Sequence, residues 1–258
     1  MAPDTVVLET FYARVPFGEA ETKDNLWEEI DEQSIASETR RRLAKNGFRV
    51  GIVGAQVPAE LAKLLALTDR AAPSAGRQGT VTADLEKEPR VVLQHTQVRA
   101  EHPVEILASD VYDRLPVLVC NASGVTGQIY FQAQGLFVLT PHLEPDRRVR
   151  LELVPELRHG ESKSRFVPLG QAGFRLDQSR SRQAFDDLSV QVTLLPGQMV
   201  VLSSLASRPG SLGHYFFTRE ADGRLEQKLV VIRLAQTQHD GLFNPQEPRP
   251  LNVSFQDR

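Results

Sequence analysis

The glycines of residues 51–55 are the first candidate for chemistry in this sequence. Gly51-Ile52-Val53-Gly54-Ala55 follows an expected strand and precedes an expected helix, which is where a glycine-rich turn can hold a phosphate. Neither G-x-G-x-x-G nor G-x-x-x-x-G-K-[ST] fits the segment, so we expect no nucleotide site. We interpret the glycines as positions where a short strand packs closely on its neighbours.

The histidines are candidate metal ligands by residue type alone. None pairs with another histidine or with a carboxylate at the helical spacing of a zinc motif. The single cysteine, Cys120, excludes a metal cage built from several cysteines. We therefore expect no metal and no cofactor, although a convergence of the histidines in space stays open. They are His95, His102, His142, His159, His214 and His239.

Serines and carboxylates give little support for hydrolysis. The chain has no G-x-S-x-G elbow, and Ser203-Ser204 lies inside an apolar strand. Asp186-Asp187 and the pair Asp110 and Asp113 could hold a cation or act as acid and base, but carboxylates beside turns commonly bond the turn itself. We expect no catalytic residues and no enzyme. A cleft that gathers these aspartates, or two histidines, would reverse that expectation.

Composition narrows the class of partner. The 258 residues carry a net charge of −3, which argues against a nucleic-acid surface. The basic run Arg40-Arg41-Arg42 is interpreted as a solvated helix face. No stretch approaches the roughly 18 consecutive apolar residues of a membrane-spanning helix, and contact with a membrane is left open. The opening Met1-Ala2-Pro3-Asp4 shows no export signal.

The elements that would position these residues change character along the chain. Residues 1–70 predict a β-α-β-α region, with strands at 5–15 and 48–53 and helical runs at 24–30, 35–45 and from Pro58. Asn46-Gly47 is typical of a helix end. A linker is expected at 71–79, a β-rich region at 80–242 and a loose tail at 243–258.

Beyond the linker, short runs of apolar and β-branched residues predict strands without intervening helices. Residues 148–158 alternate most cleanly between apolar and charged side chains, as a sheet with one wet face requires. The fold class is therefore α+β, predominantly antiparallel β. The expected strands cover 90–100, 104–107, 115–120, 128–139, 148–158, 188–195, 199–205 and 225–235.

The stretch Val190 to Gln236 resembles the C-terminal part of bacterial secretins, the ring-forming outer-membrane channels of type II and type III secretion and of pilus machinery. The resemblance lies in a Gly-Gln turn, an apolar strand closed by leucine, a Leu-Gly-x-x-Phe-like loop and a final Leu-Val-Val strand. Ser203-Ser204 replaces the family's glycine pair, and the segment between Leu205 and Gly213 is shorter than the family's. The matching residues are Gly197, Gln198, Leu205, Leu212, Gly213, Phe217 and Leu229.

The resemblance implies a non-enzymatic envelope protein of the periplasm or outer membrane. It would be a homo-oligomeric, secretin-like subunit of a ring or pore used in protein transport, with other envelope proteins as possible partners. The alternative is a soluble β-rich binding or scaffold domain that keeps the sheet without a channel. The resemblance further predicts that Gly197 has a positive φ in a β-turn joining two antiparallel strands.

Overall fold

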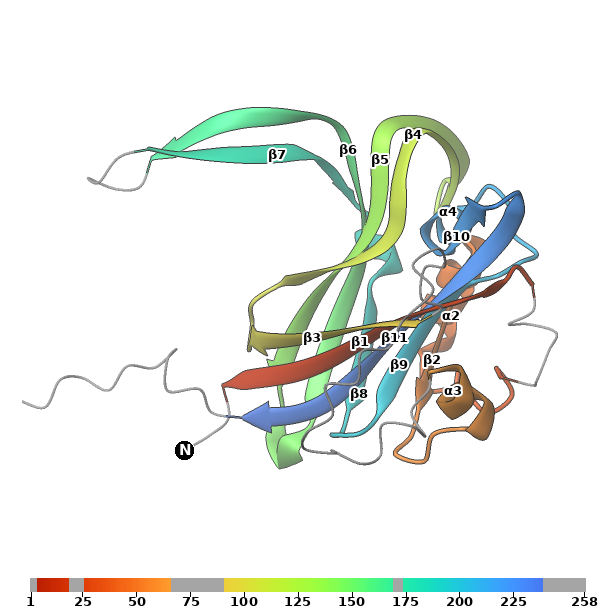
Figure 1. Ribbon diagram of the computed structural model, residues 1–258, viewed down its shortest axis with the longest axis vertical. Helices are drawn as coiled ribbons and strands as arrows, with labels where there is room; N and C mark the ends of the chain where they lie inside the picture. The colour runs from red at the N-terminus through yellow and green to blue at the C-terminus, as the bar shows by residue number, and fades with distance from the viewer. Residues whose placement is uncertain (1–3, 19–25, 66–90, 169–173, 239–258) are drawn as a thin grey trace, which may run out of the picture.

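The computed structural model describes residues 4–18, 26–65, 91–168 and 174–238 and builds them mainly from two antiparallel sheets (Figure 1). The first sheet has six strands in the order β2-β9-β11-β1-β3, with β10 beside β11. These strands are β1 (Thr5–Pro16), β2 (Phe48–Val53), β3 (Val91–Arg99), β9 (Met199–Ser204), β10 (Thr218–Ala221) and β11 (Arg224–Gln238).

The second sheet has five strands in the order β4-β5-β6-β7, with β8 pairing the first part of β6. Every ladder between named strands of either sheet is antiparallel within the described residues, which confirms the β-rich, antiparallel expectation. The five strands are β4 (Val104–Asn121), β5 (Gly124–Leu143), β6 (Val149–Pro168), β7 (Phe174–Ala184) and β8 (Val190–Leu194).

The six-stranded sheet is buried on both faces, and β9 shows how. Val200 and Leu202 belong to the core cluster that also contains residues of the five-stranded sheet. Met199 and Val201 point the opposite way, into a second cluster that contains Leu61 of helix α3 (Ala59–Leu64). Because successive side chains of a strand alternate between faces, a strand covered on both sides must be apolar throughout.

The helices are short. Helix α2 (Ser37–Lys45) ends at Asn46-Gly47, and Gly47 has a φ of +78°, so the sequence located this helix end correctly. Helix α4 (Leu212–Phe217) stands where a loop was expected, and the Ser211 hydroxyl caps it by accepting from the His214 N–H. Among the described residues, none of the helices is long and apolar enough to cross a membrane.

The helix expected at 24–30 is wrong for its described part, residues 26–30, which forms turns. The chain there runs against the edge of β2, where Asp31 and Ile52 exchange backbone hydrogen bonds of 2.9 Å each. A Cβ on Gly51 would lie 2.5 Å from Ile30 Cγ2, so this glycine does mark a close approach. Pairing with β2 therefore replaces the helix that the apolar spacing predicted.

The N-terminal β-α-β-α arrangement is not confirmed. β1, α2, β2 and α3 follow one another in the chain, but β9 and β11 lie between β1 and β2 in the sheet. The strands expected at 104–107 and 115–120 are one continuous strand, β4, while β7 and β10 were not expected. The linker at 71–79 and the tail at 243–258 lie outside the described residues, and the domain boundaries stay a prediction.

The turn at Gly197 is partly as expected. Its φ is +91°, and its N–H donates to Leu234 O at 2.7 Å. The strands that it connects do not pair with each other, however, because β8 pairs β6 in one sheet and β9 pairs β11 and β2 in the other. The expected hairpin is wrong, and the turn instead carries the chain between the two sheets.

Candidate assembly interface

The five-stranded sheet divides into two diverging hairpins. β5 and β6 pair from Leu143↔Val149 as far as Gln134↔Arg158. Past that point β5 pairs only β4 and β6 pairs only β7, and Figure 1 shows the two hairpins separating. We call residues 111–134 the tip hairpin and residues 159–184 the arm hairpin.

The strands β4, β5 and β6 all have irregular backbone at the point where the two hairpins separate. The β4 register shifts between Leu107 and Val111, and the β6 register shifts between His159 and Lys163. Between them, Gln132 of β5 has a φ of +48°, which is uncommon for a residue other than glycine. Bulges bend a strand and increase its twist, so the division of the sheet is built into its backbone.

Buried polar contacts hold the β4 bulge. The Ser109 hydroxyl accepts from the Gly135 N–H at 2.8 Å and donates to Asp110 O at 2.8 Å. Gly135 in turn packs on helix α4, because a Cβ there would lie 2.7 Å from the Phe216 ring. The bulge is thus fixed to the first sheet as well, and Lys228 Nζ adds a 3.0 Å ion pair with the Asp110 carboxylate.

The outer edge of the tip hairpin on the β4 side is covered by the chain itself. The Asn46 side chain accepts from the Cys120 N–H and donates to Cys120 O, at 2.8 Å each. The Leu118 N–H donates to Gly210 O at 3.0 Å. Pro116 has no N–H to offer. These contacts occupy both outward backbone groups of Cys120 and the outward N–H of Leu118, with which another strand would pair.

The β5 side of the same hairpin is open in the part of the chain that the structure describes. Cys120 and Leu118 direct their backbone groups away from β5, so the antiparallel alternation directs those of their cross-strand partners Val125 and Gly127 away from β4. The same alternation includes Ile129 and Phe131. We call Val125, Gly127, Ile129 and Phe131 the open edge; no hydrogen bond to their outward groups is found among the described residues.

Apolar side chains are exposed along this edge. Val125 is 67%, Ile129 46% and Phe131 60% exposed. Residues 124–133 contain no charged side chain. Edge strands of monomeric proteins usually carry charges, prolines or a covering segment that prevents pairing with another chain. The open edge has none of these, which makes it the strongest candidate interface in the described structure.

The residues of the secretin-like pattern are not on this edge and are buried or half-buried elsewhere. Leu205 donates its N–H to Gly47 O, and Gly213 donates to Asn46 O, at 2.9 Å each. Phe217 belongs to an aromatic cluster with Phe48 and Phe137. The structure therefore brings part of the pattern together around the Asn46-Gly47 turn.

The rest of the pattern serves packing elsewhere. Leu212 is buried in α4, and Leu229 lies in the outer core cluster of the first sheet. Gln198 accepts the Leu195 N–H at 2.8 Å through its side-chain oxygen, which closes the turn at Gly197. These residues therefore contribute to packing and to the turn at Gly197.

The described histidines contact carboxylates, aromatic rings or a backbone carbonyl. His142 Nδ1 lies 2.7 Å from Glu101, and His95 Nδ1 lies 3.7 Å from Glu9. His159 contacts the ring of Tyr130, and burial lowers the pKa of His214. His102 bonds a nearby carbonyl, and His239 lies outside the described residues. No group of three metal-binding side chains occurs within the described ranges.

The candidate aspartates and serines are also separate. Asp110 pairs Lys228, whereas Asp113 accepts from Gln132 Nε2 at 2.8 Å. Asp186-Asp187 lie in a single turn of 3-10 helix. The Ser203 hydroxyl donates to Lys228 O at 3.0 Å inside the sheet. These contacts place the candidate groups in turns and inter-strand bonds.

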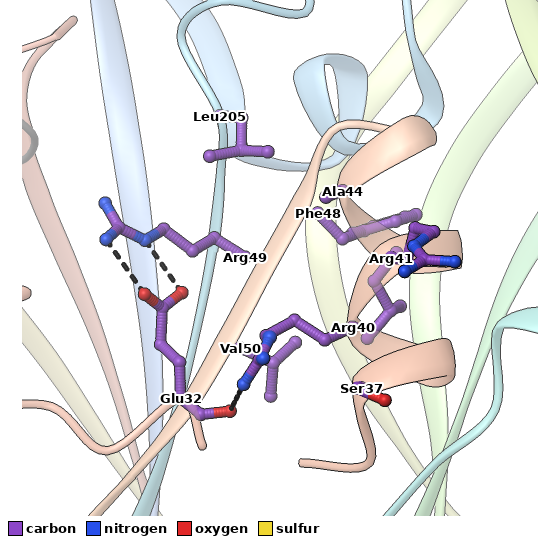
Figure 2. Close-up of a pocket in the computed structure, with 10 residues that line it drawn as sticks. Glu32, Ser37, Arg40, Arg41, Ala44, Phe48, Arg49, Val50 and Leu205 are labelled. Carbon is purple, nitrogen blue, oxygen red and sulfur yellow. Dashed lines mark hydrogen bonds and ion pairs between the residues drawn. The ribbon is translucent and has the colours of Figure 1, made fainter.

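A hollow of about 520 Å³ lies between α2 and β2, and Figure 2 shows the residues that line it. Arg49 forms a bidentate ion pair with Glu32 at 2.9 and 3.0 Å and lies 4.3 Å from the Trp27 ring. Arg40 donates to Glu32 O at 2.8 Å, while Arg41 and Arg42 are exposed. The basic run is thus only partly a solvated face, because Arg40 braces the segment before the helix.

A second hollow of about 740 Å³ lies between the sheets. Burial raises the pKa of Glu105, but the Arg158 hydrogen bond and the charges of Arg158 and Arg182 outweigh it and hold that pKa below its usual value. Burial raises the pKa of Tyr12 to about 12. The ion pairs of Glu105 and the neutral phenol of Tyr12 therefore contribute to the packing around this hollow.

Comparison with known proteins gives a limited result. No protein-family model matches the chain, and no curated protein matches it either. Among solved structures, the V. cholerae type IV competence pilus secretin PilQ, solved by single-particle cryo-electron microscopy, is a weak neighbour with a TM-score of 0.23 and 12% sequence identity. The match covers 90% of this chain and 59% of that chain, so it spans less than two thirds of the secretin.

Proposed function

We propose that this protein is a non-enzymatic subunit that associates with copies of itself into a ring or pore-like assembly of the bacterial cell envelope. The observation that carries the proposal is the divided five-stranded sheet, which leaves an uncharged edge with exposed apolar side chains on β5. The secretin-like pattern of Val190 to Gln236 supports the envelope location and the secretin-like class.

The five-stranded sheet has the two different surfaces that head-to-tail association requires. A ring forms when each copy offers two different, complementary surfaces and the rotation between copies closes. The tip hairpin offers an open edge on β5, and the arm hairpin projects away from the body of the molecule (Figure 1). Two different surfaces of one sheet are therefore available for contact with two neighbours.

A soluble binding or scaffold domain is the second candidate. The observation that favours it is the covered β4 edge, where Asn46 and Gly210 occupy the backbone groups of Cys120 and Leu118. Covering an edge in this way is how monomeric sheet proteins avoid pairing with other chains. On this alternative, the open β5 edge would accept an extended segment of a different protein.

Multi-angle light scattering after size exclusion tests the proposal, with and without mild detergent and across a range of protein concentrations. A ring predicts a discrete mass of several chains in at least one condition. A strictly monomeric protein in all of them would overturn self-association and leave the scaffold alternative.

A further inference from the structure

We propose that the open edge of β5 is the strand-addition site for a second copy, and that the arm hairpin of that copy occupies it. The inference rests on the proposed function and names the contact by which the copies join. It commits to a head-to-tail contact, in which one copy supplies the open edge and the next supplies the arm.

The backbone of the open edge is ready for strand addition. Val125, Gly127, Ile129 and Phe131 direct N–H and C=O groups away from β4, as the alternation with Leu118 and Cys120 requires. An added strand can bond these groups without breaking any bond of the hairpin. The exposed side chains of three of the same residues, Val125, Ile129 and Phe131, would pack beside the added strand.

The β4 side of a neighbouring tip hairpin is a poor occupant. Its Leu118 and Cys120 groups are already bonded to Gly210 and Asn46, and Pro116 has no N–H. Tip hairpins could therefore join β5 to β4 along these residues only by breaking the bonds of β4 to Asn46 and Gly210. This leaves the projecting arm as the favoured partner surface.

The arm matches the open edge in length. The last β5–β6 pair is Gln134↔Arg158, so residues 124–133 of β5 and residues 159–168 of β6 extend past it by equal numbers of positions. At about 3.3 Å per residue, each extends roughly 30 Å beyond the division. The arm of one copy can thus cover the whole open edge of the next.

Ile129→Pro with the matched control Ile129→Ala tests the open edge. The proline removes the outward N–H and leaves the hairpin bonds, since Ile129 lies opposite Pro116, which occupies the equivalent position in β4. Alanine removes the side chain and keeps the N–H. Loss of one hydrogen bond predicts at least about a fivefold weaker association for Ile129→Pro than for Ile129→Ala in light-scattering titrations.

Gly127→Pro and Gly127→Ala are a second matched pair of variants for the case that Ile129→Pro does not fold. A Cβ on Gly127 would lie 3.6 Å from Leu118, an ordinary contact, so Gly127→Ala fits while Gly127→Pro again removes an outward N–H. Circular dichroism spectra and urea midpoints equal to those of the native chain establish that each variant is folded.

The arm is tested by replacing residues 161–179 with Asn-Gly, a sequence typical of two-residue hairpin turns. We expect this chain to lose assembly and Ile129→Pro to assemble about fivefold more weakly. At a concentration where neither variant assembles alone, an equimolar mixture of the two should form a one-to-one dimer. Normal assembly of either folded variant would overturn the contact while the proposed function stands. A monomeric native chain would overturn both.

Discussion

Substituting Gly213 by alanine tests the packing between helix α4 and the Asn46-Gly47 turn. Gly213 is buried in α4, and its N–H donates to Asn46 O at 2.9 Å. A Cβ at this position would overlap the Gly47 carbonyl and lie 2.7 Å from the backbone nitrogen of Phe48. Both neighbours are backbone, so they cannot swing aside as a flexible side chain would.

We expect Gly213→Ala to lower the free energy of unfolding, although helix propensity alone predicts that it raises it. Glycine to alanine stabilises a helix interior by about 1 kcal/mol, which is an upper limit for Gly213 as the second residue of α4. Overpacking against a fixed neighbour costs about 1–3 kcal/mol, and losing the bond to Asn46 costs about 1 kcal/mol more. The balance for Gly213→Ala is a loss of roughly 1–3 kcal/mol in the free energy of unfolding.

Urea denaturation followed by circular dichroism measures this change, at a concentration where the chain is monomeric. Gly54→Ala is the matched control, because a Cβ there has no neighbour within 4 Å and we expect a change within about 0.5 kcal/mol. A stabilised Gly213→Ala, or one indistinguishable from the control, would refute the close approach of α4 to Gly47.

Other parts of the structure give further predictions. Asn46→Ala removes the bonds to Cys120 and should cost about 2–4 kcal/mol in urea unfolding, with faster hydrogen exchange of the Cys120 amide; a loss under about 1 kcal/mol would contradict it. Gly135→Ala displaces the Phe216 ring and should lower the thermal midpoint. The Tyr12 pKa of about 12 predicts late phenol titration in the absorbance at 295 nm, with an amplitude that falls by one phenol in Tyr12→Phe, since burial also raises the pKa of Tyr112. Because the raised pKa favours the neutral phenol, the stability it contributes is complete below about pH 10 and is lost as pH rises towards 12.

Local patterns predicted the strands well where one rule decided the structure. Residues 149–157 alternate in burial as their sequence alternates in polarity, and the register with β5 is regular there. Gly47 ended its helix with a positive φ because few other residues adopt that conformation easily. In both cases residues that are close together in the sequence are enough to predict the structure.

The failures come from contacts between distant segments. Leu26, Trp27 and Ile30 have helical spacing, but backbone pairing of the following Asp31 with Ile52 decides the conformation. The strands expected at 104–107 and 115–120 are one strand, β4, in which the missing N–H of Pro116 faces an edge and interrupts no pairing with β5. The division of the sheet could not be predicted, since it depends on bulges held by Ser109 and by α4.

The secretin-like pattern and the open edge are different residues, yet the structure connects them. Gly213 and Leu205 bond the backbone of the Asn46-Gly47 turn, and the Asn46 side chain then occupies the outward groups of Cys120. The pattern thereby helps to close the β4 side of the tip hairpin and leaves β5 as its open side. In the proposed assembly, substitutions of Gly213 or Leu205 should act through the position of Asn46, whereas substitutions on β5 should act on the contact itself. The two groups of variants differ in a measurable way, because the first lowers the stability of the monomer and the second does not.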